Sequence, residues 1–144
     1  MAELPAPKGF QLTYARRPEL PFPGAEDWFV VVFTKEGVRW PSRPWIEIKA
    51  ALFGTEDGPQ GFLMGLDFEA SGWITPGGDV ALGDFVLTNR PTPTTFAVVF
   101  VRNNFLVFGT AHKAVDDEAP EIIESEVYDL LRQVDARMVE VISQ

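Results

Sequence analysis

The chain contains no cysteine, which excludes disulfides, thiolate catalysis and cysteine-ligated metal sites. It contains a single histidine, His112, so no site built on two histidines can form. His112 follows the last expected strand and stands beside Lys113, where a surface or strand-end histidine is the simplest interpretation. The sequence therefore predicts neither a bound metal nor a cofactor.

Long hydrophobic runs are also absent. The longest, Trp28 to Phe33 and Phe96 to Val101, have six residues each, whereas a membrane span needs about 20. The N-terminus has no charged region leading into an apolar segment, so we expect no signal peptide. The expected location is the cytoplasm or a virion.

Motifs that would indicate catalysis are missing as well. No serine stands in a G-x-S-x-G elbow, and the glycine-rich stretch 72–83 lacks a phosphate-binding pattern. Asp67 and Glu69 share one face of an expected strand, and Asp79 and Asp84 bracket a loop. Such pairs serve in glycosidases or bind Ca²⁺, but neither has the spacing of a known loop. We predict that the chain is not an enzyme.

Basic residues are scarce toward the C-terminus. The net charge is −9, and residues 116–144 hold two bases against nine acids. An acidic surface repels phosphate, so no nucleic-acid partner is expected. Frequent proline and an excess of arginine over lysine fit a thermophilic or high-GC source.

Proline is concentrated at the start of the chain, where residues 1–23 hold five of the twelve. Proline fixes φ and pushes the preceding residue toward extended geometry. We therefore predict an extended, proline-rich arm over residues 1–27, followed by one β-rich domain over residues 28–144. The arm also carries more apolar side chains than a solvated linker needs: Leu4, Phe10, Leu12, Tyr14, Leu20 and Phe22.

The domain is predicted to begin with short strands, because apolar runs and alternating patterns are separated by glycine and proline. Asn103-Asn104 is a plausible two-residue hairpin turn between two of them, since asparagine tolerates the left-handed region. Two further stretches, 54–61 and 89–94, are expected to be loops. The strands are expected over these segments: Trp28 to Phe33, Val38 to Trp40, Trp45 to Phe53, Gly61 to Glu69, a short one within 72–79, Phe85 to Leu87, Phe96 to Val101 and Phe105 to Thr110.

The last part of the chain, about residues 117–142, is predicted to be one amphipathic helix. Apolar residues recur there at steps of three and four, and acids and Pro120 stand at its start. No βαβ alternation appears. The expected fold is mainly β (α+β), an antiparallel sandwich or small barrel of 7–8 strands, with an extended N-terminal arm and one C-terminal helix.

A structural or interaction protein explains this layout best, with the arm holding neighbouring copies in a homo-oligomer such as a trimer, together with other assembly proteins. In organisation the chain resembles capsid decoration or cementing proteins of virions. One alternative is a small acidic regulator or inhibitor that binds a macromolecular partner through the C-terminal helix; a second is a β-domain that binds a small ligand. The expected interaction residues are Phe10, Leu12, Tyr14, Leu20, Phe22, Trp40 and Trp45.

Overall fold

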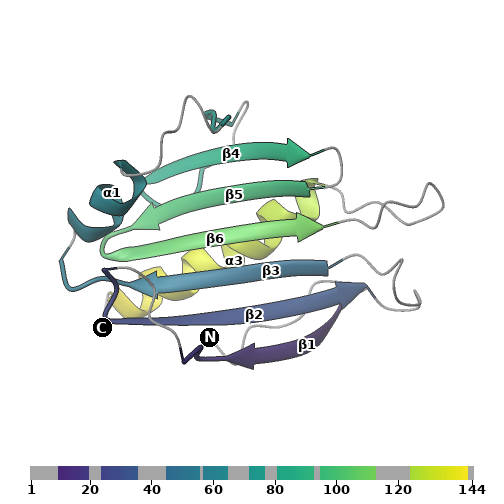
Figure 1. The fold of residues 1–144 in the computed structure, drawn as a ribbon, viewed down its shortest axis with the longest axis horizontal. Coiled ribbons are helices and arrows are strands. Elements are labelled where there is room, and N and C mark those ends of the chain that lie inside the picture. Colours follow the sequence, from purple (N-terminus) through teal and green to yellow (C-terminus); the bar gives the residue numbers. More distant parts are fainter. Residues whose placement is uncertain are drawn as a thin grey trace.

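The computed structural model describes residues 10–19, 24–35, 45–55, 57–64, 72–76, 81–92, 95–112 and 124–142. These residues form six strands and two helices, drawn in Figure 1. The strands are β1 (Phe10–Arg16), β2 (Asp27–Lys35), β3 (Trp45–Leu52), β4 (Phe85–Thr92), β5 (Thr95–Arg102) and β6 (Phe105–His112). The helices are α1 (Asp57–Met64) and α3 (Glu124–Ile142).

All strand pairs are antiparallel, in the order β1-β2-β3-β6-β5-β4. The sheet thus consists of two three-stranded meanders, β1 to β3 and β4 to β6, joined where β3 pairs with β6 (Figure 1). β3 and β6 are central strands, and β1 and β4 lie at the two edges of the sheet.

Helix α3 covers one face of the sheet, where it packs on β5 and β6. Strand residues alternate between the faces, and on this face they join the helix in one apolar cluster. Gly109 in β6 lies directly beneath Leu131, so that a Cβ there would stand 2.9 Å from the leucine side chain. The fully buried members include Phe33, Ile46, Ile48, Val98, Phe100, Val107, Leu130 and Leu131.

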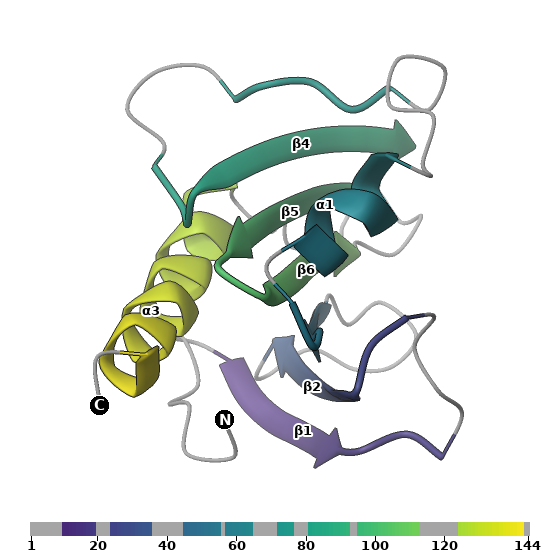
Figure 2. The same ribbon diagram turned by 90° about the vertical axis from the view of Figure 1, so that its left-hand side faces the viewer.

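Helix α1 lies on the opposite side of the sheet from α3 (Figure 2). Phe62 of α1 meets Phe108 of β6 edge-on at 6.2 Å, and Trp73 meets the same ring at 6.3 Å. A second apolar cluster, which includes Phe53 and Leu63, forms between this helix and the sheet. Both faces therefore contribute to the core, which agrees with the apolar character of β2 and β5.

The fold class predicted from the sequence is confirmed: the protein is mainly antiparallel β with a C-terminal helix that packs on the sheet. The two apolar runs are strands in which residues 30–33 and 96–101 are all buried. The Asn103-Asn104 turn is also confirmed, because Arg102 pairs with Phe105 and Asn103 has a φ of +52°. The described strands number six, with one isolated bridge at Ile74, against the expected seven or eight.

The division between arm and domain at residue 27 requires a correction. Residues 10–16 of the predicted arm are extended as expected, but they form β1 and pair with β2 across that boundary. Phe10 is 3% exposed and belongs to the core beneath α3. The sequence signal was misleading because one buried phenylalanine, rather than a period-2 pattern, attaches the strand to the core.

The segment 54–64 also differs from the prediction. Asp57–Met64 is helix α1, whereas we expected a loop up to Gly61 and a strand from Gly61 to Glu69. Gly58 lets the helix approach the Phe53 ring, since a Cβ there would lie 2.6 Å from that side chain. The sequence did not indicate this helix, because Gly58 and Gly61 lower its helix propensity and residues 61–69 alternate as a strand would. Its start signals, an acid at Asp57 and Pro59 in the first turn, were present in the sequence.

A third difference concerns the predicted loop 89–94, because β4 continues to Thr92. Its register with β5 shifts between Asn89 and Thr92, the stretch that contains Pro91. An edge strand with an irregular register is where proline is tolerated within a sheet. Residues 93 and 94, the expected strand 38–40 and the expected helix start at 117–123 lie outside the described residues.

Candidate functional site

The predicted interaction residues fall in three places. Phe10 is buried in the chain's own core, so it is not a contact for a neighbour. Leu12 lies on β1 with 47% of its surface exposed, and Trp45 is half-buried at the first position of β3. Tyr14 is a residue of β1 and the register partner of Val32 on β2. The remaining three, Leu20, Phe22 and Trp40, lie outside the described residues, so they stay predictions.

Strand β1 is an exposed edge of the sheet. Among the described residues its one strand neighbour is β2. A β-bulge interrupts the ladder between Leu12 and Tyr14, and the Thr13 hydroxyl lies 2.9 Å from that of Thr34. An edge strand presents backbone N–H and C=O groups that another chain can pair with. The exposed side chains of this edge are Gln11, Leu12, Thr13, Ala15 and Arg16.

The opposite edge, β4, is partly closed by the chain itself. Ile74 forms an isolated antiparallel bridge to Thr88, with both hydrogen bonds made: Ile74 N–H to the Thr88 carbonyl at 2.9 Å, and the reverse at 2.8 Å. Ile74 therefore satisfies the outward backbone groups of Thr88. The two edges of the sheet thus differ in how far they are protected.

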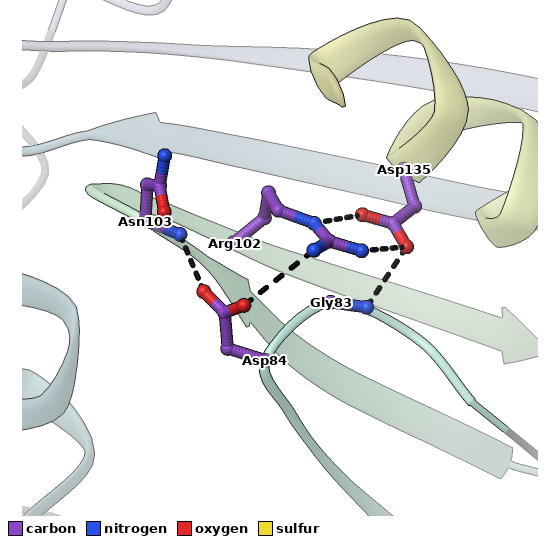
Figure 3. A network of polar contacts seen from close by, with 5 residues as sticks. All are labelled: Gly83, Asp84, Arg102, Asn103 and Asp135. Carbon is purple, nitrogen blue, oxygen red and sulfur yellow. Dashed lines mark hydrogen bonds and ion pairs between the residues drawn. The ribbon is translucent and has the colours of Figure 1, made fainter. Parts of the chain in front are cut away.

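A polar network fastens the β4 side of the sheet to α3 (Figure 3). Arg102, the last residue of β5, donates from Nε to Asp135 Oδ1 at 2.8 Å and from Nη2 to Asp135 Oδ2 at 2.9 Å. The Gly83 amide donates to the same Oδ2 at 2.8 Å. Asp84 lies 3.5 Å from Arg102 Nη1 and accepts the Asn103 amide at 2.9 Å. We call these five residues the Arg102 clasp.

The clasp keeps Asp135 ionised although its side chain is nearly buried. Burial would raise the pKa of Asp135, but the hydrogen bonds from Arg102 and the Gly83 amide, with the Arg102 charge, together hold it below its ordinary value. The hydrogen bond to Asp135 raises the pKa of Arg102. Asp135 accepts three hydrogen bonds from groups of the chain itself, so the clasp joins α3, β5 and the start of β4.

A second polar cluster lies at the other end of the central strands. Trp45 and His112 are register partners on β3 and β6, and their rings stack with centroids 4.6 Å apart and planes 17° from parallel. Glu47 and Lys49 follow on the same face of β3, joined by a 3.4 Å ion pair. Burial lowers the pKa of His112, the Glu47 charge raises it and the Lys49 charge lowers it, with a net shift downward.

The carboxylate pairs considered from the sequence are not tested by the structure, because it describes only one of the four residues. Asp67, Glu69 and Asp79 lie outside the described residues, and Asp84 is engaged in the clasp. No group of three or more metal-ligating side chains occurs in the part of the chain that the structure describes. None of its described helices is long and apolar enough to cross a membrane.

The clasp was not predicted from the sequence. Its signal was Asp135, an acid flanked on the helix by Leu131, Val134 and Met138, which are all buried. A carboxylate on the border of an apolar stripe needs a cationic partner. Arg102, at the end of the most apolar strand, was the available candidate, but only the tertiary fold brings them together.

No protein-family model, curated protein or solved structure matches this chain.

Proposed function

We propose that this protein is a non-enzymatic interaction domain, a subunit of a homo-oligomeric assembly in which the β1 edge of one copy pairs with the same edge of another. The observation that carries this proposal is the contrast between the two edges of the sheet. The β4 edge has the Ile74 bridge, whereas β1 exposes five side chains and has one strand neighbour among the described residues.

Leu12 supports an association at this edge. Among the described residues it is one of four large hydrophobic side chains that are strongly exposed, and the one of these four that lies on the β1 edge. Addition of a strand to a sheet edge gains main-chain hydrogen bonds, and side chains such as Leu12 supply the apolar contact. A two-fold axis across β1 makes the interface self-complementary, as in most homodimers.

Two features limit the strength of this association. The bulge leaves three regularly paired residues on each side of Thr13, which restricts the length of ladder that a second copy can extend. Each copy also carries a net charge of −9, so two copies repel one another at long range. The two Arg16 side chains do not add to this repulsion, because an antiparallel pair of β1 strands places them at opposite ends of the interface. We expect a weak, reversible association that strengthens with added salt.

The alternative of an acidic helix that captures a basic partner receives less support. On the described part of α3, Asp129 pairs with Arg132 and Glu140 with Arg137. Asp135 is buried in the clasp, and Glu126 faces Lys35 at 3.8 Å. Four of the five acids of α3 therefore face a cation of the same chain, although the chain segment that contains the helix is acidic.

The test is light scattering coupled to size exclusion, run over a wide concentration range on the wild type, Leu12→Lys and Val139→Lys. Lysine on an edge strand opposes pairing with another edge. Val139, 41% exposed on α3, provides the matched control because it is another exposed aliphatic side chain away from β1. We expect the wild type and Val139→Lys to exceed the monomer mass as concentration rises, while Leu12→Lys remains monomeric.

A wild type that stays monomeric at every concentration and salt would overturn the proposal. So would a Leu12→Lys variant that associates as strongly as the wild type. Deletion of residues 1–23 is not a suitable test, because it removes an entire strand and the buried Phe10 ring.

A further inference from the structure

The Trp45–His112 stack lies at one end of the sheet, where β3, β6 and β5 are neighbours. Trp45 is the first residue of β3 and His112 is the last residue of β6. His112 is also the register partner of Thr95, the first residue of β5. The imidazole therefore has a tryptophan on one neighbouring strand and a threonine on the other, and it is half-buried between them.

Two charges of opposite sign act on this imidazole. Glu47 and Lys49 lie on the same face of β3 as Trp45, and their side chains are 25% and 43% exposed. On β6 and β5 the neighbours on that face are Thr110, Thr95 and Ala97, none of which titrates near neutral pH. Among the described residues, Glu47 and Lys49 are the charged groups that influence His112.

The surroundings of His112 have opposite effects on the protonation of its ring. Burial and the Lys49 charge favour the neutral imidazole, whereas the Glu47 carboxylate favours the imidazolium. The face of Trp45 also attracts a cation. Burial and Lys49 prevail, so the pKa of His112 lies below its ordinary value of 6.5. The ring is thus mostly neutral at pH 7 and gains its charge at a pH below 6.5.

We propose that the Trp45–His112 stack is a proton-operated latch that closes this end of β3, β5 and β6. Neutral His112 keeps the latch closed. Protonation forces either a charge into a half-buried position beside Lys49 or a movement of the ring toward solvent, and the strand ends loosen. Because the folded-state pKa lies below the unfolded one, the stabilisation is complete above pH 6.5 and is lost as the pH falls through the folded-state value.

The titration of His112 tests the set point of the latch directly. The chain has a single histidine, so one imidazole signal is followed by NMR from mildly alkaline to acidic pH. We expect a midpoint below 6.5 in the wild type, an upward shift in Lys49→Gln and a downward shift in Glu47→Gln. A midpoint at or above 6.5, or one that neither variant moves, would overturn the proposal.

The opening itself is measured by amide hydrogen exchange at a pH well above the His112 midpoint found by NMR and at a pH below it, expressed as protection relative to the unfolded chain. We expect protection at Ile46 and Ala111, beside the stack, to fall several-fold at the lower pH. Leu52 and Leu106, at the other end of the same strands, provide the internal control and should not change. His112→Gln should remove the difference between the two pH values.

Trp45→Phe provides a second variant in case His112→Gln disturbs the fold. It should retain an aromatic stack and a titrating His112, but lose the pH-dependent step in tryptophan fluorescence that we expect of the wild type at the same midpoint. If protection at Ile46 and Ala111 were the same at both pH values, or fell no more than at Leu52 and Leu106, protonation would not open this end of the strands and the latch would be rejected.

Discussion

The two edges of the sheet are fastened to very different degrees. On the β4 side, the Arg102 clasp joins the sheet to α3 through three hydrogen bonds of 2.8–2.9 Å to Asp135, and Ile74 pairs with Thr88 from outside. On the β1 side, the ion pair from the sheet to α3 within the described structure joins Lys35 of β2 to Glu126 at 3.8 Å, and one Glu126 oxygen is buried there without a described hydrogen-bond partner.

This difference indicates that the β4 side contributes to the stability of the fold, whereas the β1 edge is available for association. In the clasp, Arg102 at the end of β5 and Asp135 on α3 face one another, and each charge is paired with the other through charge-assisted hydrogen bonds. Strand β1 is attached mainly through its ladder with β2 and the single ring of Phe10. We therefore expect substitutions on the β4 side to affect stability, and substitutions on the β1 edge to affect association.

The largest loss of stability is expected for Gly83→Ala. Gly83 has a φ of +59°, and a Cβ there would overlap the Val101 carbonyl. The left-handed conformation alone costs about 1–2 kcal/mol, and relief of the overlap would displace the clasp, so we expect a total of about 3 kcal/mol or more by urea denaturation.

The control for that substitution is Gly61→Ala. Gly61 lies within α1 and has no atom near its Cβ position. Alanine should stabilise the helix there by about 0.5–1 kcal/mol. If both variants changed the free energy of unfolding by the same amount, the account of a tightly built β4 side would be wrong.

Asp135→Ala should have the next largest effect, because it leaves the Arg102 guanidinium and the Gly83 amide without their shared acceptor. Removal of one partner from a buried pair costs several kcal/mol; Arg102 keeps some solvent access, so we expect about 2–3 kcal/mol. Asp129→Ala on the same helix removes an exposed pair and should cost about 0.5 kcal/mol or less.

At the β1 side, Glu126→Ala should cost less than about 1 kcal/mol, because its pair is long and partly exposed. The same denaturation series measures all three carboxylates. A cost for Glu126→Ala equal to that for Asp135→Ala would remove the distinction between the two edges.

The clasp should also give acid sensitivity of a definite sign. The pKa of Asp135 lies below its unfolded value of 3.8, so its contribution is present above that pH and is lost as the pH falls through the folded-state value. Wild type should therefore lose stability below about pH 4 more steeply than Asp135→Asn. Parallel curves for the two proteins would contradict an ionised Asp135.

The smallest stability effect is expected for Leu12→Lys. Since the side chain is 47% exposed on an edge strand, the free energy of unfolding should change by about 0.5 kcal/mol or less at a concentration where the wild type is monomeric. Thermal or urea unfolding in dilute solution checks this. A large loss would mean that Leu12 belongs to the core and that its effect on association is indirect.

Much of the fold could be predicted because its signals are local. The runs at 28–33 and 96–101, the two-asparagine turn and the period of the C-terminal helix each specify their element without reference to the rest of the chain. Helix α1 was missed because Gly58 and Gly61 weaken its signal, and the glycine at 58 is explained by a tertiary contact with Phe53.

The candidate site was harder to predict for the same reason. β1 was recognised as extended and apolar, but the sequence could not show that Phe10 turns into the chain's own core while Leu12 remains outside. The Arg102–Asp135 and Trp45–His112 contacts join residues 33 and 67 positions apart. Each is set by sheet register and helix placement, which a sequence pattern does not contain.

The most direct test of self-association through β1 uses the absence of cysteine. A nitroxide on Ala15→Cys reports the distance between two copies by pulsed electron spin resonance, with Asp129→Cys on α3 as the control position. Antiparallel pairing of β1 with β1 predicts a short inter-label distance on the order of 20 Å, given about 3.3 Å per strand residue. A longer or absent distance at Ala15 in a sample that light scattering shows to be oligomeric would contradict pairing through the β1 edge.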